Sequence, residues 1–587
     1  MYNKFNYHRR CFRVIEKAKR LAGIFSGNKY LIFLLGSLIG FIFFVAIFGL
    51  SIINPTNIDW IFAGGGDLAQ HYLGWAFFRD SDWSFPLGMI ENLAYPFGIP
   101  LTFMDAIPLF AVIFKLLSPI LPETFQYLGL FTVLSFVLQG GIAALILRRF
   151  TSNIIIIAIG VVFFVVSPVV LMRSLAHTAL TASWIVLLGI YFVLRFSNKK
   201  IEPLPFMATW CLLLVLSVLI HPYFFPMTLA LFCISIVKTY HRERVWLTAI
   251  RVLTPIIIAL SVFGLFGGFM KAGDALNELD LDIYSLNIVS PIDPMGNSAF
   301  MSRQAFVDDR QGIPETSEKT AYLGLGVIML LLVLVYELVR RLSIVGWKNT
   351  KSRLRTLVSA KNIAIAVIVI ALFIFSLGSH IKIADQVLFT WQLPDAIEKL
   401  WLTFRSSARM FWPIYYLIIL GILVFFIRRF KGKKAIYLAL FLIPVMVIQV
   451  LDIRLSSVVR AKKAFAHNIT HTQPDASKSI GVRIASDETL CGKKHLISLS
   501  PYLYLEEFVD FSKAAVPCDM TMSEGYYAHH YKQQDIREFM AREKAKVLSG
   551  EADFKNNLYL TTDEKFANEV DARYDVQKIR NWFVIKE

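Results

Sequence analysis

The chain has 587 residues, of which 56% are hydrophobic and 49 are phenylalanine, and its mean hydropathy is +0.56. A soluble protein could not cover so much apolar surface with polar side chains, so this composition excludes a soluble globular enzyme. The formal net charge of +17 would suit a nucleic-acid binder, but the surplus lies in short segments beside the apolar runs, where membrane topology alone requires it.

Long apolar runs alternate with clusters of Lys and Arg from the N-terminus onward. Basic residues are frequent in positions 1–30, which we expect to be a cytoplasmic N-terminus, and the uncharged run after them is too long for a signal peptide. Later runs carry basic clusters at alternate ends, such as Arg148 and Arg149, and the positive-inside rule places these clusters in the cytoplasm. The pattern predicts about eleven spanning helices, with the N-terminus inside and the C-terminus outside. The expected spans are 31–53, 124–147, 154–172, 174–194, 203–220, 223–237, 252–270, 321–336, 362–379, 410–427 and 435–451.

One apolar segment does not fit this alternation. Residues 106–121 are apolar enough to span, but a full crossing there would move every later basic cluster to the outside. The prolines at Pro108, Pro119 and Pro122 also limit the length of a helix in this segment. We therefore expect a re-entrant or interfacial helix against the outer surface, with a twelve-span topology as the alternative.

The chain divides into two parts near residue 451. The membrane part covers 31–451 and has two long outer loops, at 54–123 and 271–320. Residues 452–587 are charged and contain short alternating runs, so we expect a soluble α/β domain outside the cytoplasm. The predicted fold class is an all-α polytopic membrane protein with this α/β domain at its C-terminus.

Two of the five cysteines, Cys491 and Cys518, fall in the C-terminal domain. A disulfide between them would be allowed in an oxidising compartment, and two buried free thiols fit the sequence about equally well. Metal-ligand spacings such as C-x-x-C or H-E-x-x-H do not occur in the sequence.

The first outer loop carries two acidic residues, Asp59 and Asp67, separated by a G-G-G run that is a weak signal for phosphate binding. After Asp67 the apolar residues have helical spacing, which favours a helix that lies on the membrane surface. Its apolar positions are Leu68, Tyr72, Trp75 and Phe78. A carboxylate at this boundary would have a raised pKa, suitable for a general base. The alternative, which composition alone favours, is that Asp67 only caps the helix.

Basic side chains near the outer ends of the expected spans are candidates for binding a phosphate. His177 follows Arg173 by four residues, so the two share a face if one helix runs through both. Arg405 and Arg409 have the same spacing just before a late span, and guanidinium groups are well suited to a phosphate or pyrophosphate. The alternatives are a structural histidine and arginines that anchor to lipid headgroups. We interpret His221, at an outer turn, as structural.

Taken together, these features resemble the GT-C superfamily of membrane glycosyltransferases, which transfer sugars from polyprenyl-phosphate donors on the outer side. The resemblance rests on the acidic first outer loop (Asp59, Asp67), interfacial helices behind it, many spans and a soluble outer C-terminal domain. The segment F-R-S-S-A-R-M-F, at 404–411, is also similar to an Arg-rich segment before a late span in bacterial members.

The resemblance implies an inverting hexosyl or pentosyl transfer in which one carboxylate of the first outer loop acts as general base. We assign that base to Asp67, with Asp59 next in line, although many members carry adjacent acidic residues and these two are eight apart. The donor phosphate would be neutralised by basic side chains or by a divalent cation such as Mg²⁺ or Mn²⁺, and members differ in their need for a metal. The candidate phosphate-binding residues are Arg173, His177, Arg405 and Arg409.

The expected partners are a polyprenyl-phosphate-sugar donor, membrane lipids and a glycan, lipid or protein acceptor of the cell envelope. The expected location is a bacterial inner membrane with the C-terminal domain in the periplasm. Three other interpretations stay open: a polysaccharide polymerase or ligase, a flippase or transporter of lipid-linked sugars, and a non-catalytic assembly protein. The transporter is disfavoured because the expected spans carry few ionisable residues.

Overall fold

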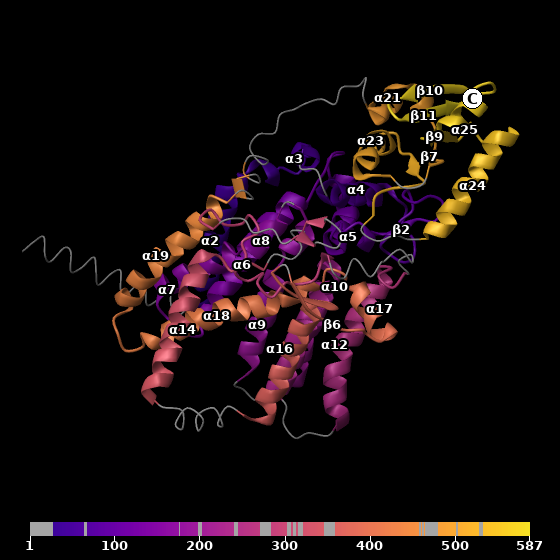
Figure 1. Cartoon of the computed structure of the whole chain (residues 1–587). Coiled ribbons are helices and arrows are strands. Elements are labelled where there is room, and N and C mark those ends of the chain that lie inside the picture. The colour runs from indigo at the N-terminus through magenta and orange to yellow at the C-terminus, as the bar shows by residue number, and fades with distance from the viewer. Residues whose placement is uncertain are drawn as a thin grey trace, which may run out of the picture.

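The computed structural model has two parts, a body of apolar helices and a smaller C-terminal domain (Figure 1). It describes the chain except for 1–27, 64–66, 175, 198–201, 240–244, 271–282, 302–306, 309–312, 315–320, 346–357, 385, 457–458, 461–462, 464–478, 501–502 and 528–531. The G-G-G run, nearly all of the basic N-terminus and much of the predicted loop 271–320 therefore lie outside the described residues.

Helices occupy all of the predicted spans. They are α2 (Lys29–Phe48), α6 (Leu128–Leu147), α7 (Ile154–Val165), α9 (Trp184–Phe196), α10 (Pro203–Ile220), α11 (Phe224–Thr239), α12 (Val245–Leu265), α14 (Leu325–Val345), α16 (Ala360–Leu377), α18 (Trp412–Arg429) and α19 (Ala435–Arg454). Among the described residues, eight helical stretches are long and apolar enough to cross a membrane, one of them being α9 together with the turn before it (Thr178–Phe196). Helices α7 and α11 are shorter, and α14 is not among the eight. The prediction of a polytopic helical membrane protein is therefore confirmed.

The segment that did not fit the alternation forms a short helix, α5 (Pro108–Leu117), followed by a 3₁₀ turn, η3 (Ser118–Ile120). Ten α-helical residues rise only about 15 Å, which is half of a bilayer core. The buried ammonium of Lys115 donates to the carbonyls of Phe78 and Ser81, at 2.7 and 2.6 Å. These bonds fix α5 against the end of the helix Asp67–Asp80. This length fits a segment that does not cross the membrane.

The first outer loop folds into short elements between α2 and α6. These are η1 (Ser51–Ile53), α3 (Asp59–Ala63), α4 (Asp67–Asp80), β1 (Met89–Ile90), β2 (Ile99–Pro100) and η2 (Leu101–Phe103). Helix α4 does not lie on the membrane surface as predicted, because every residue from Leu68 to Phe78 is buried within the protein. The reason is that α5 packs on one side of α4 and the C-terminal domain on another, where the rings of Phe77 and Phe508 stack.

The remaining short elements connect the helices of the body. They are α8 (Pro168–Arg173), η4 (Thr178–Thr181), β3 (Val307–Asp308), β4 (Ile313–Pro314), β5 (His380–Ile383), β6 (Gln386–Thr390), α17 (Asp395–Thr403) and η6 (Ser407–Phe411). Helix α19 runs to Arg454, three residues beyond the predicted domain boundary. Its Asp452 is fully buried and accepts bonds from the hydroxyl of Tyr322, at 2.9 Å, and the amide of Leu325, at 3.0 Å. Asp452 therefore belongs to the membrane body.

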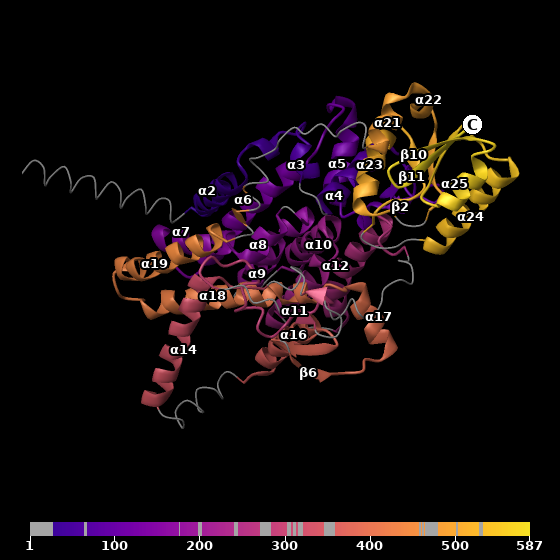
Figure 2. The same ribbon diagram turned by 45° about the horizontal axis from the view of Figure 1, so that its top comes forward.

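The C-terminal domain is the α/β domain that the sequence predicts. Its elements are α21 (Ile480–Ser486), α22 (Glu488–Cys491), β7 (His495–Ser498), α23 (Leu505–Ala515), β8 (Thr521–Met522), α24 (Gln533–Ser549), β9 (Asn557–Thr561), α25 (Glu564–Val570), β10 (Asp575–Ile579) and β11 (Trp582–Lys586). The strands form one mixed sheet in the order β10-β11-β9-β7-β8, in which β7 runs parallel to both of its neighbours. The domain sits beside α4 and α5, while α12, α14 and α16 extend away from it (Figures 1 and 2).

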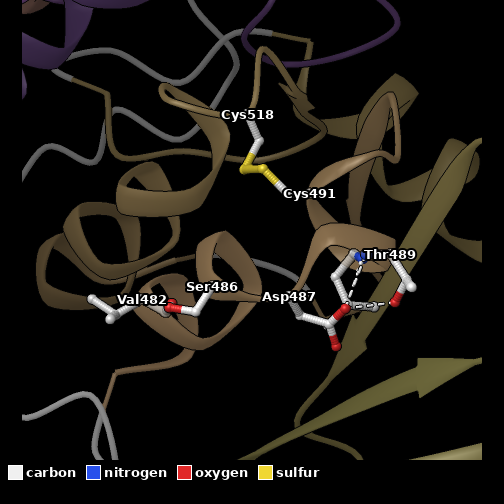
Figure 3. Close-up of a disulfide and its surroundings, with 7 residues drawn as sticks. Val482, Ser486, Asp487, Thr489, Cys491 and Cys518 are labelled. Atoms are coloured by element: carbon white, nitrogen blue, oxygen red, sulfur yellow. Dashed lines mark hydrogen bonds between the residues drawn. A yellow bond between two sulfur atoms is a disulfide. The ribbon is translucent and has the colours of Figure 1, made fainter.

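Cys491 and Cys518 form a disulfide, so the thiol alternative is excluded (Figure 3). The bond joins the end of α22 to the segment after α23, across a sequence separation of 27 residues. Disulfides persist mainly in oxidising compartments. The free cysteines among the described residues, Cys211 and Cys233, lie in the apolar helices α10 and α11.

Candidate functional site

A cavity of about 690 Å³ lies between the loop 54–123, the ends of several apolar helices and the C-terminal domain. Its polar wall comes from the loop around α4 and from the turn before η4. Its apolar wall includes Val218 of α10 and Leu260 and Phe263 of α12, two helices that are long enough to span. The cavity therefore connects charged side chains with the apolar surface of membrane helices, and its volume is in the range of small-molecule sites.

Two carboxylates and two imidazoles belong to the polar wall, and a third imidazole, that of His71, is buried beside it. Asp67 begins α4, and its Oδ2 lies 3.4 Å from Nε2 of His177. The Oδ1 of Asp105 lies 3.4 Å from Nε2 of His221. His71, one turn after Asp67 on α4, places its ring 6.2 Å from the ring of His177. The loop and three separate helix ends thus bring these five side chains together.

Burial shifts the pKa of two of these groups in opposite directions, because it disfavours the charged form of each. The pKa of His71 is lowered to about 3, first by burial and then by its proximity to His177. The pKa of Asp105 is raised to about 6 by burial, although His177 and Arg409 oppose the shift. His71 is therefore a neutral imidazole at physiological pH, and Asp105 titrates close to neutrality.

Two arginines form the opposite side of the pocket. Arg405 follows α17, and its guanidinium lies 5.7 Å from the ring centre of Tyr284. Arg409 is buried within η6, and its guanidinium lies 4.5 Å from the ring centre of Tyr223. The amide of Ser406, between them, donates to the hydroxyl of Tyr223 at 3.0 Å. The aromatic rings position both cations toward the cavity, where they can neutralise an anion.

The C-terminal domain contributes Tyr526 and Tyr527 to the lining of the cavity. Burial raises the pKa of Tyr526, and the neighbouring Asp67 raises it further, whereas Arg405 lowers it. The domain is held in place by main-chain bonds: the Met522 amide donates to Asn92 and the Tyr95 amide donates to Met522, both at 2.9 Å. The site is thus completed by a segment more than four hundred residues away from Asp67 in the sequence.

Four of the six predicted site residues line the cavity. They are Asp67, His177, Arg405 and Arg409. The other two described residues do not line it: Asp59 begins α3, and Arg173 is buried at the end of α8. One helix does not run through Arg173 and His177, since α8 ends at Arg173 and η4 begins after His177. The condition for a shared helical face is therefore not met, and His177 reaches the cavity from the turn between the two helices.

Asp105, His71, His221 and Tyr526 were not assigned a role from the sequence. His221 reads as a turn residue, and Asp105 is one of many acidic residues in a polar loop. A sequence signal existed only for His71, which lies four residues after Asp67 and so shares its helical face. The pairing of Asp105 with His221 depends on two chain segments meeting in space, which local patterns do not encode.

Nitrogen and oxygen atoms of His71, Asp105 and His177 all lie within 4.8 Å of one another, which is close enough for one metal ion to bind all three side chains. Two imidazoles and one carboxylate are a donor set that suits transition metals better than Mg²⁺, which prefers oxygen ligands. The residues present therefore fit a transition metal, a class that includes Mn²⁺, better than they fit Mg²⁺.

The fold and the pocket define a polytopic membrane protein whose polar cavity is enclosed between its helical body and a C-terminal α/β domain. The chain belongs to the family described as domain of unknown function DUF6311, whose model matches residues 37–454. A second model, described as the DUF6311 C-terminal domain, matches residues 487–587, in agreement with the two parts of the structure. Comparisons with curated proteins and with solved structures find no match.

Proposed function

We propose that the protein is a membrane glycosyltransferase that transfers a sugar from a polyprenyl-phosphate-linked donor to a cell-envelope acceptor on the outer side of a bacterial inner membrane. The observation that carries the proposal is the two-sided character of the cavity. Its arginines and carboxylates suit a sugar phosphate, and its walls on α10 and α12 suit the lipid chain attached to that phosphate. A soluble sugar donor would not need the apolar wall.

The sidedness follows from the charges at the two ends of the helices. The cavity residues lie at the outer ends of the predicted spans, whereas basic clusters such as Arg148–Arg149 and Arg428–Arg429 lie at the opposite ends. A topology of eleven spans gives this arrangement and leaves the C-terminal domain outside. The Cys491–Cys518 disulfide supports the same side, since the periplasm is oxidising.

In the proposed reaction, Asp67 accepts the proton of the acceptor hydroxyl as that oxygen attacks the anomeric carbon of the donor sugar. The bond from that carbon to the phosphate oxygen breaks, and the negative charge that develops on the phosphate is stabilised by Arg405 and Arg409. His177, 3.4 Å from Asp67, orients the carboxylate. The chemistry is that of the GT-C superfamily, and the proposal extends the resemblance noted in the sequence.

The proposal predicts that Asp67→Asn lowers transfer at least about a hundredfold, because the amide cannot accept the proton. The assay uses the full chain in proteoliposomes with a panel of polyprenyl-phosphate sugars. Arg405→Ala should weaken the use of donor by roughly tenfold or more, the cost of a lost charged hydrogen bond. The matched control is Asp59→Asn, which removes a carboxylate of the same loop that does not line the cavity.

If Asp59→Asn loses transfer while Asp67→Asn keeps full activity, the general base is Asp59 and not Asp67. A wild-type protein that moves lipid-linked sugar across the bilayer without forming a covalent product would instead establish a flippase. Size-exclusion profiles and thermal stability of each variant show whether a lost activity reflects misfolding.

A further inference from the structure

The cluster of His71, Asp105 and His177 has a feature that the proposed transfer reaction does not use. The side chain of His71 is fully buried, and among the described residues neither of its ring nitrogens has a hydrogen-bond partner. Buried polar atoms in folded proteins are almost always paired, since burying an unpaired one costs free energy. A buried imidazole whose ring nitrogens have no partner among the described residues, within 4.8 Å of an imidazole and a carboxylate, is therefore suited to donating a lone pair to a metal ion.

The backbone around Asp105 holds the carboxylate in place. Asp105 and Ile107 adopt left-handed conformations with φ of 50° and 52°, which are unfavourable for a β-branched residue such as Ile. Between them, the carbonyl of Ala106 accepts a hydrogen bond from the hydroxyl of Tyr127. Strained backbone that is fixed by its surroundings is common where a side chain must be aimed at a ligand.

Two further contacts surround the three side chains. Asp67 lies 3.4 Å from Nε2 of His177, and His221 lies 3.4 Å from Oδ1 of Asp105. Metal-binding histidines commonly interact with a carboxylate through their second nitrogen, which fixes the ring orientation. The three candidate ligands are thus flanked by a carboxylate and an imidazole.

We propose that His71, Asp105 and His177 bind one divalent transition-metal ion, with Zn²⁺ as the best match. Two imidazoles and one carboxylate are the ligands of catalytic zinc sites and of other first-row metals, and they leave a coordination position open. Zinc-to-ligand bonds of about 2.0–2.2 Å require the ligand atoms to approach by on the order of 1 Å, a shift that side-chain torsions can supply. Asp105 and His177 also line the cavity in which the proposed phosphate would lie.

The proposal does not depend on the identity of the reaction, because the metal can be measured on the protein alone. The full chain is purified in detergent, stripped with a chelator, and titrated calorimetrically with ZnCl₂. A second titration with CoCl₂ reports the coordination geometry through the visible absorption of Co²⁺. We expect about one equivalent of tightly bound metal. The visible absorption of the bound Co²⁺ should be that of an ion with nitrogen and oxygen ligands and a low coordination number.

Asp105→Asn and His177→Ala should each lower the affinity for zinc at least tenfold and alter the cobalt spectrum. His380→Ala is the matched control, since it removes an imidazole that is outside the cluster, and its affinity should equal that of the wild type. Thermal unfolding of each metal-free variant checks that it is folded. If His177→Ala does not fold, Asp105→Asn, which is the more conservative change, still tests the proposal. Wild-type protein that binds far less than one equivalent of either metal, or an unchanged affinity in both ligand variants, would overturn the proposal.

Discussion

At the scale of single residues, burial shifts the pKa values of two groups of the site in opposite directions. Asp105 lines the cavity, and burial raises its pKa to about 6. His71 is forced to be neutral, while His177 lies beside the Asp67 carboxylate. A carboxylate that titrates near neutrality beside fixed imidazoles is the kind of group that functional sites concentrate.

Glu524, just before the two tyrosines that line the cavity, gives a test of this effect on stability. Burial raises its pKa to about 7, although the Gly525 amide, which donates to Oε1 at 3.1 Å, opposes the shift. The folded protein therefore binds more protons than the unfolded chain between about pH 4.5 and 7. Stability from this group is present below that window and is lost as the pH rises through it, by up to about 3 kcal/mol.

We expect Glu524→Gln to remove this loss, so that the variant is more stable than the wild type at pH 8 and nearly equal to it at pH 5. The measurement is thermal unfolding in detergent, followed by intrinsic fluorescence at pH 5 to 8. Glu506→Gln, at an exposed position of α23, serves as the control and should keep the wild-type pH dependence. A wild type and a Glu524→Gln variant with parallel pH profiles would contradict the prediction.

At the scale of elements, α2 and α6 pack with their backbones in close approach. A Cβ atom at Gly36 would lie 2.2 Å from the carbonyl oxygen of Gly140, and one at Gly40 would lie 2.0 Å from that of Phe136. Both atoms are backbone, so neither can move aside without separating the helices. Small residues four apart are the usual means by which membrane helices approach this closely. Helix α2 leads into the first outer loop, so this contact positions the cavity.

Gly40→Ala should push α2 away from α6 and destabilise the protein by about 1–3 kcal/mol or more. The measurement is the monodisperse yield and thermal midpoint in detergent. Gly421→Ala on α18 is the matched control, because a Cβ there meets no atom within 4 Å. Equal losses in the two variants would mean that close packing at α2 and α6 is not the cause.

At the scale of the whole molecule, the C-terminal domain closes the cavity through contacts with the first outer loop. The ring of Tyr95 stacks on His495, with centroids 4.1 Å apart, beside the two main-chain bonds of Met522. Phe77 and Phe508 stack at a second point of the junction. The C-terminal domain is therefore part of the site, independently of any partner that binds its outer surface.

Tyr95→Ala should loosen this junction, because it removes the stacked ring without changing the main chain. Hydrogen–deuterium exchange is expected to increase at the amides of Tyr95 and Met522, with little change in α2 and α6. Tyr437→Ala, at an exposed position near the start of α19, is the control. Unchanged exchange at Met522 in Tyr95→Ala would show that the domain is held by its other contacts alone.

Much of the fold and part of the site are encoded locally in the sequence. Apolar runs of sufficient length become helices because the bilayer requires every main-chain polar group to be satisfied within its own segment. Basic clusters at alternate ends set the predicted orientation, and Asp67, Arg405 and Arg409 could be selected because they lie beside those runs. The α/β nature of the tail followed from its short alternating segments.

Only the tertiary structure decided which side chains meet. Asp105 is paired with His221 because a strained loop and a helix end converge, and Tyr526 reaches the cavity because a separate domain docks on α4. The same docking buries α4, which its own sequence predicts to lie at the membrane surface, and Arg173 and His177 do not share one helix. Sequence periodicity describes an element and its environment. A site depends on contacts between elements that are far apart in the chain, and local sequence patterns do not encode those contacts.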